Sequence, residues 1–190
     1  MGSMMTNEAA LGTRPLWRGV RRAVWTGLAA LLLAPLIAMR FTDEVDWSAM
    51  DFIVMGTMLA LVGGAFEGVM RVARSPLYVF GAGVAVAAAF LTTWVNLAVG
   101  IIGNESNPVN LAFFLVPAIP FIGALLARFA PAGMVRAMIA ATVMQAATCM
   151  LSYLEGEPVA VAFTAMMTGM WLLSAALFER AARAPSPATD

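Results

Sequence analysis

The stretch from Arg18 to Arg74 reads RGVRRAVWTGLAALLLAPLIAMRFTDEVDWSAMDFIVMGTMLALVGGAFEGVMRVAR, and it decides the fold. A basic segment, a long apolar run, an acidic segment, a second apolar run and a basic segment follow one another in it. Each run is close to the roughly 20 residues that a helix needs to cross a bilayer. Because arginine gathers on the cytoplasmic side of a membrane, the stretch predicts a helical hairpin with two cytoplasmic ends.

The same alternation continues along the chain. Of its eleven arginines, all but Arg40 lie in alternate gaps between apolar runs, and most acids lie in the other gaps. We therefore predict an all-α integral membrane bundle of six transmembrane helices, antiparallel and up-down with short loops, in a bacterial inner membrane with both termini cytoplasmic. The predicted spans are 23–39, 52–70, 75–104, 106–127, 131–154 and 158–178. The stretch 75–104 is long enough for a tilted helix and a short loop.

Two segments lie outside the predicted transmembrane domain, 23–180. Residues 1–22 form a basic cytoplasmic segment, and 181–190 are rich in proline and alanine, which favours a disordered cytoplasmic tail. Met1-Gly2-Ser3 ahead of Met4-Met5 is typical of residues added for expression, with the natural start at Met4 or Met5.

Composition narrows the classes of function. The chain is 62% hydrophobic and only 12% charged, against about 45–50% and about 25% in soluble domains, so lipid must be its solvent. It has no histidine, the commonest general base and transition-metal ligand, and a single cysteine. We predict no enzyme, no cofactor, no metal and no nucleic-acid partner. The fifteen methionines invite a copper(I) interpretation, but generic packing is the favoured one.

Glu67 is the one acid inside a predicted span. Ionisable groups in a membrane are costly and suggest a proton or cation site. Arg71 follows four residues later, one helical turn toward the cytoplasmic face. A structural pair of Glu67 with Arg71 is therefore the favoured interpretation, and an ion site is the alternative.

The outer face carries a second group of candidates. Trp47 and Trp94 are expected at the membrane interface, and shielded asparagines need hydrogen-bond partners. We predict that the loop 40–51 and the segment 94–110 pack together there, with backbone groups of the facing loop as partners for the asparagines. Ser48 to Asp51 is a capping-box-like helix start. The predicted ligand or partner patch consists of Asp43, Glu44, Trp47, Trp94, Asn96, Glu105, Asn107 and Asn110.

Small and polar residues inside the spans predict helix contacts. Gly64 and Gly68 have the Gly-x-x-x-Gly spacing of a homodimer face, although we favour ordinary packing within one bundle. Gln145, with Thr142 and Thr148, places polar groups in the middle of the fifth span, where bonds between helices are their favoured role.

Several motifs carry a family resemblance. They are Phe41-Thr42-Asp43-Glu44-Val45-Asp46-Trp47 running to Asp51-Phe52; Trp94-Val95-Asn96-Leu97-Ala98-Val99-Gly100-Ile101-Ile102-Gly103 followed by Glu105, Asn107-Pro108 and Asn110-Leu111; and Gly133-Met134 with Arg136-Ala137 and Gln145. From about Arg18 to Arg183 the chain resembles a group of small multi-helix bacterial inner-membrane proteins. The resemblance implies a membrane protein with no assigned activity and carries over no catalytic residue.

Three functions follow as hypotheses. The first is a structural or accessory membrane subunit, acting through helix–helix contacts with itself or within a larger membrane complex, with the lipid bilayer as its other partner. The alternative is a small transporter or channel for an ion or metabolite, using Glu67, Asn96 and Gln145. A membrane enzyme is the least favoured because histidine is missing. A polar cavity joining these residues would favour transport, and a dry bundle with a flat small-residue face would favour the accessory role.

Overall fold

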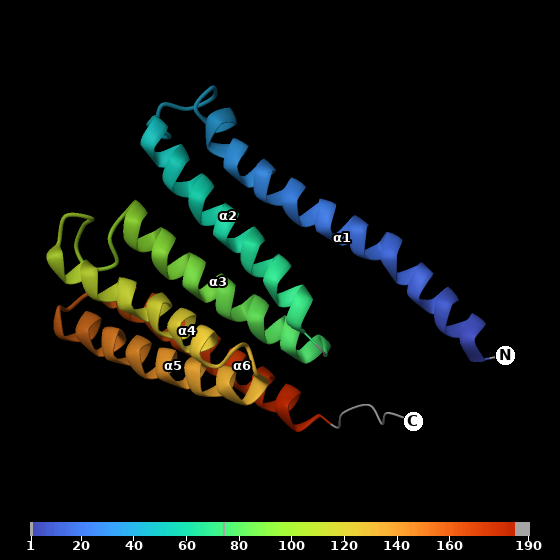
Figure 1. Cartoon of the computed structure of the whole chain (residues 1–190). Coiled ribbons are helices and arrows are strands. Elements are labelled where there is room, and N and C mark those ends of the chain that lie inside the picture. The colour runs from blue at the N-terminus through green and yellow to red at the C-terminus, as the bar shows by residue number, and fades with distance from the viewer. Residues whose placement is uncertain (1, 74, 185–190) are drawn as a thin grey trace. The chain divides into compact units, whose positions relative to one another are not determined.

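The computed structural model describes residues 2–73 and 75–184, with side chains from residue 18 onward. Throughout these residues the chain is all-helical, and six helices are long and apolar enough to cross a membrane (Figure 1). Their bounds are α1 Gly2–Ala38, α2 Ala49–Val72, α3 Pro76–Ala98, α4 Leu115–Leu126 preceded by the 3-10 helix η1 Pro108–Phe114, α5 Pro131–Leu154 and α6 Pro158–Arg183.

Most predicted span boundaries agree with these helices, and the fourth differs. The stretch 75–104, expected to hold a tilted helix and a short loop, contains α3 up to Ala98 and the first part of the loop 99–107. The fourth span begins as a 3-10 helix over Pro108–Phe114 and becomes α-helical only at Leu115. Pro117 and Pro120 have no N–H, so two α-helical hydrogen bonds cannot form in this span.

The ends of the chain also differ from the predicted segments. α1 continues without a break across the predicted boundary at 22/23, and its membrane-crossing part is Arg18–Ala38. α6 continues to Arg183, so residues 181–183 are helical and not part of a disordered tail. The rest of that tail, 185–190, lies outside the described residues.

The chain divides into two compact units, residues 1–64 and 65–190. In unit 1, α1 packs on α2 through glycines: a Cβ added at Gly63 would lie 2.6 Å from the ring of Trp25, and one added at Gly56 would lie 3.6 Å from Leu32. Gly64 behaves differently, because nothing lies within 4 Å of a Cβ added there. Gly63 is therefore the packing glycine of this hairpin.

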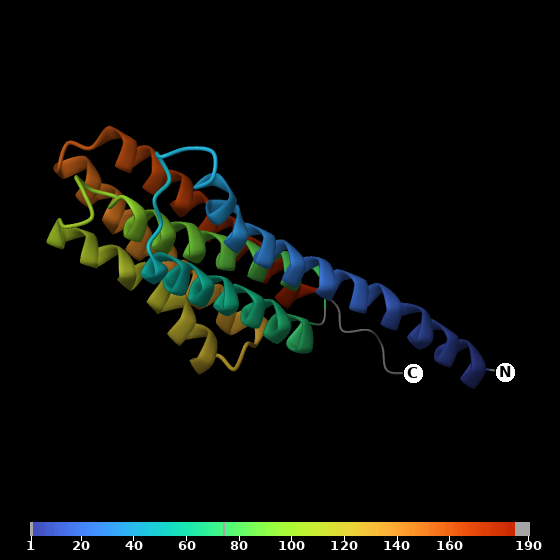
Figure 2. The same ribbon diagram turned by 90° about the horizontal axis from the view of Figure 1, so that it is seen from above.

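In unit 2 the four helices α3, α6, α5 and α4 form a ring, each packing on the next, as Figures 1 and 2 show. The loops 99–107 and 155–157 lie at one end of this ring, which we call the asparagine end. The other end, with residues 127–130 and the last turn of α6, is called the arginine end because it carries Arg128, Arg180 and Arg183.

The interior of unit 2 has three zones. An apolar core near the arginine end is built on large side chains such as Trp171 and Phe178, both fully buried. A smaller apolar cluster of Ile101, Ile102, Phe113 and Ala160 closes the asparagine end. Between them lies a layer of uncharged polar side chains, none more than 4% exposed, which we call the polar layer: Thr92, Asn96, Gln145, Thr148, Ser152 and Thr164.

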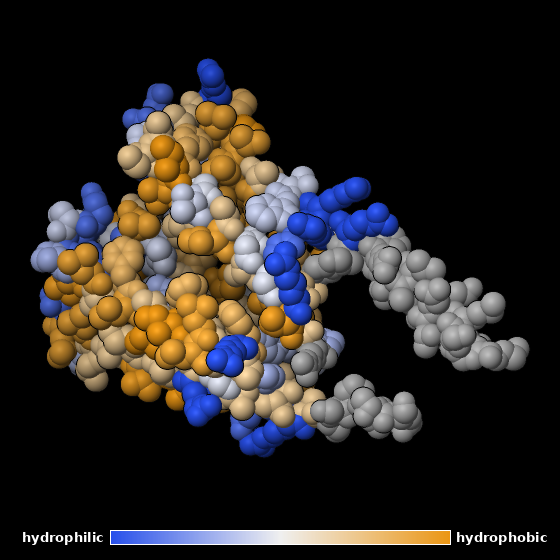
Figure 3. Space-filling view, viewed as in Figure 1, coloured by the Kyte–Doolittle hydropathy of each residue, from blue (hydrophilic) through white to orange (hydrophobic). Residues whose placement is uncertain are grey.

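The outside of the helices is apolar. Phe80, Val143 and Leu126 are 67%, 66% and 81% exposed. In Figure 3 hydrophobic residues cover most of the face in view, and hydrophilic residues are confined to a few groups. A protein with polar side chains inside and large apolar side chains outside would be unstable in water. This arrangement is compatible with lipid as the surrounding solvent.

Candidate functional site

The asparagine end of α3 is a tight loop that depends on glycine. Gly100 has φ +70°, and a Cβ there would lie 2.4 Å from the backbone carbon of Asn104. Only glycine adopts this conformation without strain and leaves room for the approaching chain. The loop therefore turns back sharply enough for residues 101–104 to surround the side chain of Asn110.

Asn110 uses its whole hydrogen-bonding capacity in this loop. Its Oδ1 accepts the N–H groups of Ile101 at 3.2 Å and Ile102 at 2.9 Å. Its Nδ2 donates to the carbonyl oxygens of Ile102 at 3.1 Å and Asn104 at 2.7 Å. Asn96 Nδ2 donates to the backbone oxygen of Asn110 at 3.0 Å and ties the loop to α3. An asparagine side chain has two donors and one two-lone-pair acceptor, so Asn110 has no capacity left for a ligand.

The neighbouring polar side chains have local roles as well. Asn107 Oδ1 accepts the N–H of Val109 at 3.1 Å and caps η1. Glu105 is exposed in the turn, and Trp94, 38% exposed, stacks on Phe90 with a centroid separation of 6.3 Å. We call Asn96, residues 100–104, Asn107 and Asn110 the asparagine knot.

The knot corrects one expectation about the outer-face patch. The hydrogen bonds of Asn96, Asn107 and Asn110 are to residues 101–110 of their own segment. The reason is that the positive-φ glycines fold this loop over its own asparagines. The packing of loop 40–51 against the segment 94–110 stays a prediction, as does the binding role of the patch.

The loop of unit 1 confirms the helix start that the sequence indicates. Ser48 N–H and Oγ donate to Asp51 Oδ2 at 2.7 and 2.8 Å, and Asp51 N–H donates to Ser48 Oγ at 3.3 Å. This is a reciprocal capping box at the start of α2. Trp47 packs edge-on against Phe52 with centroids 5.3 Å apart. Asp43, Glu44 and Asp46 are exposed beside it and form no common site with the cap.

Glu67 and Arg71 lie one turn apart on α2, where Glu67 is partly buried and Arg71 is exposed. The pairing of these two side chains and the alternative of an ion site both stay predictions. Among the residues that the structure describes, no three His, Cys, Asp or Glu side chains come together in an arrangement able to hold a metal ion.

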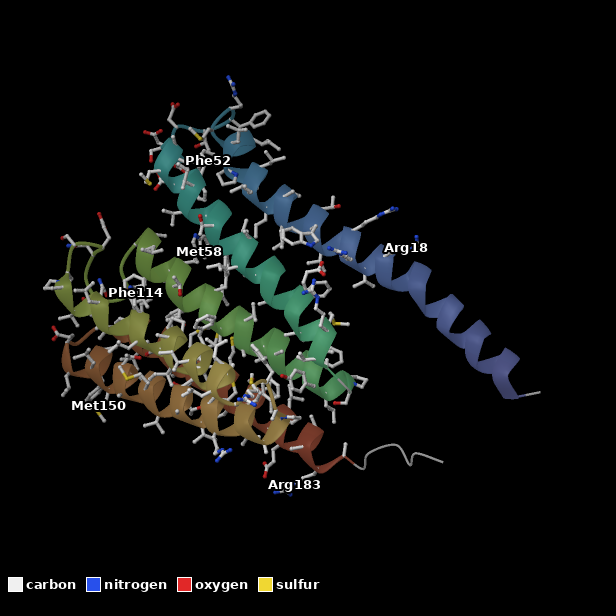
Figure 4. The ribbon with its side chains drawn as sticks, viewed as in Figure 1. Arg18, Phe52, Met58, Phe114, Met150 and Arg183 are labelled. Atoms are coloured by element: carbon white, nitrogen blue, oxygen red, sulfur yellow. The ribbon has the colours of Figure 1, made fainter. Side chains whose placement is uncertain are left out.

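The polar layer was only partly anticipated from the sequence, which singled out Asn96, Gln145 and Thr148. Thr92 and Thr164 join them. The available signal was spacing: Thr92 and Asn96 are four residues apart on α3, and Thr142, Gln145, Thr148 and Ser152 follow a helical period on α5. Figure 4 shows the side chains of this part of unit 2, with Phe114 and Met150 labelled near its asparagine end.

The hydrogen bonds of the polar layer are incomplete. Gln145 Nε2 donates to Thr148 Oγ1 at 3.0 Å, and Thr148 Oγ1 donates to the backbone oxygen of Gln145 at 2.8 Å. Gln145 Oε1, Asn96 Oδ1 and Thr92 Oγ1 are buried without a protein partner. Buried polar atoms normally have hydrogen-bond partners, so these three oxygens are exceptions to the rule.

No family model, curated protein or solved structure matches the chain. The family resemblance of its motifs therefore stays a prediction, and the case for function rests on the geometry of the two units.

Proposed function

We propose that this protein is a structural or accessory subunit of a bacterial inner membrane, acting through helix–helix contacts, first of all with a second copy of itself. In this proposal the six helices run antiparallel and up-down, with both termini cytoplasmic. The distribution of arginines and acids supports that orientation, which would place the asparagine end outside.

One observation carries the proposal: a strip of small, exposed residues on α2. Ala60, Gly64 and Gly68 follow one another at four-residue spacing, so they share one face of the helix, and all three are exposed. Nothing lies within 4 Å of a Cβ added at Gly64 or Gly68. The neighbouring Gly63, by contrast, is occupied by Trp25 of α1. The same helix thus has one glycine used inside the chain and two left open.

An open small-residue strip in a membrane helix allows another backbone to approach closely. Such a strip is self-complementary when two copies pair about a twofold axis, because each copy presents the same face. Two copies inserted in the same orientation meet this condition. The sequence favoured packing within one bundle for Gly64 and Gly68, and the open space at both positions now supports the homodimer face instead.

The test is self-association of the purified chain in lipid vesicles, measured by energy transfer between two differently labelled preparations as lipid dilutes them. Gly64→Ile and Gly68→Ile should weaken association roughly tenfold, about 1.4 kcal/mol, by blocking backbone approach. Gly83→Ile and Gly169→Ile are matched controls, since both glycines are exposed on other spanning helices with nothing within 4 Å of an added Cβ. Equal association of all four variants and the parent would contradict the proposal.

The second candidate, a small transporter or channel, is favoured by the unpartnered oxygens of Asn96 and Gln145. The accessory role is preferred because the polar layer contains no charged residue and its hydroxyls mostly bond to their own helices. Uptake of radiolabelled cations into vesicles, abolished by Gln145→Met, would reverse this preference.

A further inference from the structure

We propose that the polar layer of unit 2 is a hydration site, in which water is bound between α3, α5 and α6 around Thr92, Gln145 and Thr164. The site lies within the helix ring, between the apolar core and the apolar cluster at the asparagine end. It is separate from the α2 strip and independent of the self-association proposed above.

The helix register places Thr92 and Thr164 at the same height. Ser174 Oγ donates to the backbone oxygen of Gly81 at 2.8 Å, and Tyr78 packs on Phe178 with centroids 4.9 Å apart. From the second contact to the first, the residue numbers rise along α3, from Tyr78 to Gly81, and fall along α6, from Phe178 to Ser174. Thr92 lies eleven residues beyond Gly81, and Thr164 lies ten residues before Ser174. At about 1.5 Å per residue, both threonines are about 15–17 Å from that contact.

Gln145 reaches the same height on α5. Cys149 Sγ contacts the backbone oxygen of Val161 at 3.7 Å, which fixes the register of α5 against α6. Gln145 lies four residues before Cys149, and Thr164 lies three residues after Val161. All three side chains of this level, Thr92, Gln145 and Thr164, are fully buried, so they face the interior of the ring from three different helices.

The atoms left unpartnered at this level include both acceptors and donors. Gln145 Oε1 and Asn96 Oδ1 can only accept, whereas the Thr92 hydroxyl can donate as well. Gln145 Nε2 carries two N–H groups and has one partner, Thr148. A bound water satisfies acceptors and donors together, whereas an alkali cation would satisfy only the oxygens.

The surrounding hydroxyls are oriented to receive water. Thr164 Oγ1 donates to the backbone oxygen of Ala160 at 2.6 Å, and Ser152 Oγ donates to that of Thr148 at 2.9 Å. Because their protons are used, the lone pairs of these hydroxyls remain available as acceptors.

The first test uses the fact that Gln145 is the only glutamine in the chain. Selective labelling with ¹⁵N at the glutamine side chain then gives a single NH₂ signal in lipid bicelles. We expect a direct magnetisation transfer from water to this NH₂ group, although the side chain is fully buried. Absence of that transfer, with normal transfer to an exposed labelled asparagine, would overturn the proposal.

The second test compares isosteric substitutions by thermal unfolding of the full chain. Thr92→Val should lower the unfolding midpoint by about 2–4 °C, because bound water then loses a partner. Thr142→Val is the matched control, since the Thr142 hydroxyl donates to its own helix at Met138 O and leaves no unpartnered atom. If the layer is dry, Thr92→Val removes an unpartnered oxygen, and an unchanged or higher midpoint would contradict hydration.

The same measurement separates water from a cation. The midpoint should be equal in sodium, potassium and choline chloride at one ionic strength. A stabilisation specific to sodium or potassium that disappears in Thr92→Val would assign the site to that cation and overturn the assignment to water.

Discussion

The apolar core and the polar layer of unit 2 are built on the same helices but hold them together in different ways. On α5 the buried face changes from Met134, Met138 and Ala141 to Gln145 and Thr148 within a few turns. Near the arginine end, contact comes from large side chains against small ones, such as Phe178 against Gly81. Toward the asparagine end, buried polar side chains replace this packing, and Asn96 and Asn110 join α3, the following loop and η1 by hydrogen bonds. In lipid, where no hydrophobic drive holds helices together, close packing and polar contacts are the two available means of association.

The asparagine knot should be the most sensitive point of the polar half. Asn110→Leu removes the partners of four backbone groups, at about 1 kcal/mol each, so the expected loss is about 4 kcal/mol of unfolding free energy. Reversible unfolding in mixed detergent micelles measures it. Asn104→Ala, at an exposed residue whose side chain bonds only to Ser106, is the control and should change stability little. A loss for Asn110→Leu no larger than for Asn104→Ala would show that the knot does not hold this end.

The apolar half is tested by Phe178→Ala. This ring is fully buried against Tyr78, and its removal leaves a cavity that should cost about 3 kcal/mol. Phe80→Ala is the matched control on α3, because Phe80 is 67% exposed and faces the surroundings. Similar costs for the two variants in the same unfolding assay would mean that the apolar core contributes no specific packing.

The sequence predicted the six apolar helices well, because hydropathy reports directly on the membrane as solvent. The span 131–154 agrees with α5, and the capping box at Ser48 is present. Hydropathy averages over all faces of a helix, however, so it could not show that Gly63 packs while Gly64 is open. That distinction depends on where Trp25 lies across the hairpin.

The asparagine knot could not be predicted from the sequence, for a different reason. Asn96 and Asn110 were recognised as residues that need partners, but their partners depend on the positive φ of Gly100 and the path of the loop that follows. A single sequence shows that residue 100 is a glycine, but it does not show that the chain turns there with a positive φ. Likewise, Thr92 was overlooked because a threonine in an apolar run carries no signal until the register of the helices brings it level with Gln145.

A smaller effect should come from a hydrogen bond that links α3 and α6 within the apolar core. Ser174→Ala removes the bond from Ser174 Oγ to Gly81 O and should cost about 0.6 kcal/mol, the average for bonds between membrane helices. Thr168→Val is the control on α6, because its hydroxyl bonds only to its own helix at Thr164 O. If Ser174→Ala destabilises the chain as much as Phe178→Ala, the contrast between packed and hydrogen-bonded halves is wrong.

The orientation of these two halves in the membrane underlies the whole account, and accessibility labelling tests it most directly. After replacement of Cys149, the only cysteine, single cysteines are placed at Val45, Ser106 and Glu155 and, as an inner control, at Ala130. A membrane-impermeant thiol reagent added to spheroplasts should label the first three positions, and Ala130 only after the membrane is opened. Labelling of Ala130 in intact spheroplasts, with protection of the other three, would contradict six crossings with cytoplasmic termini.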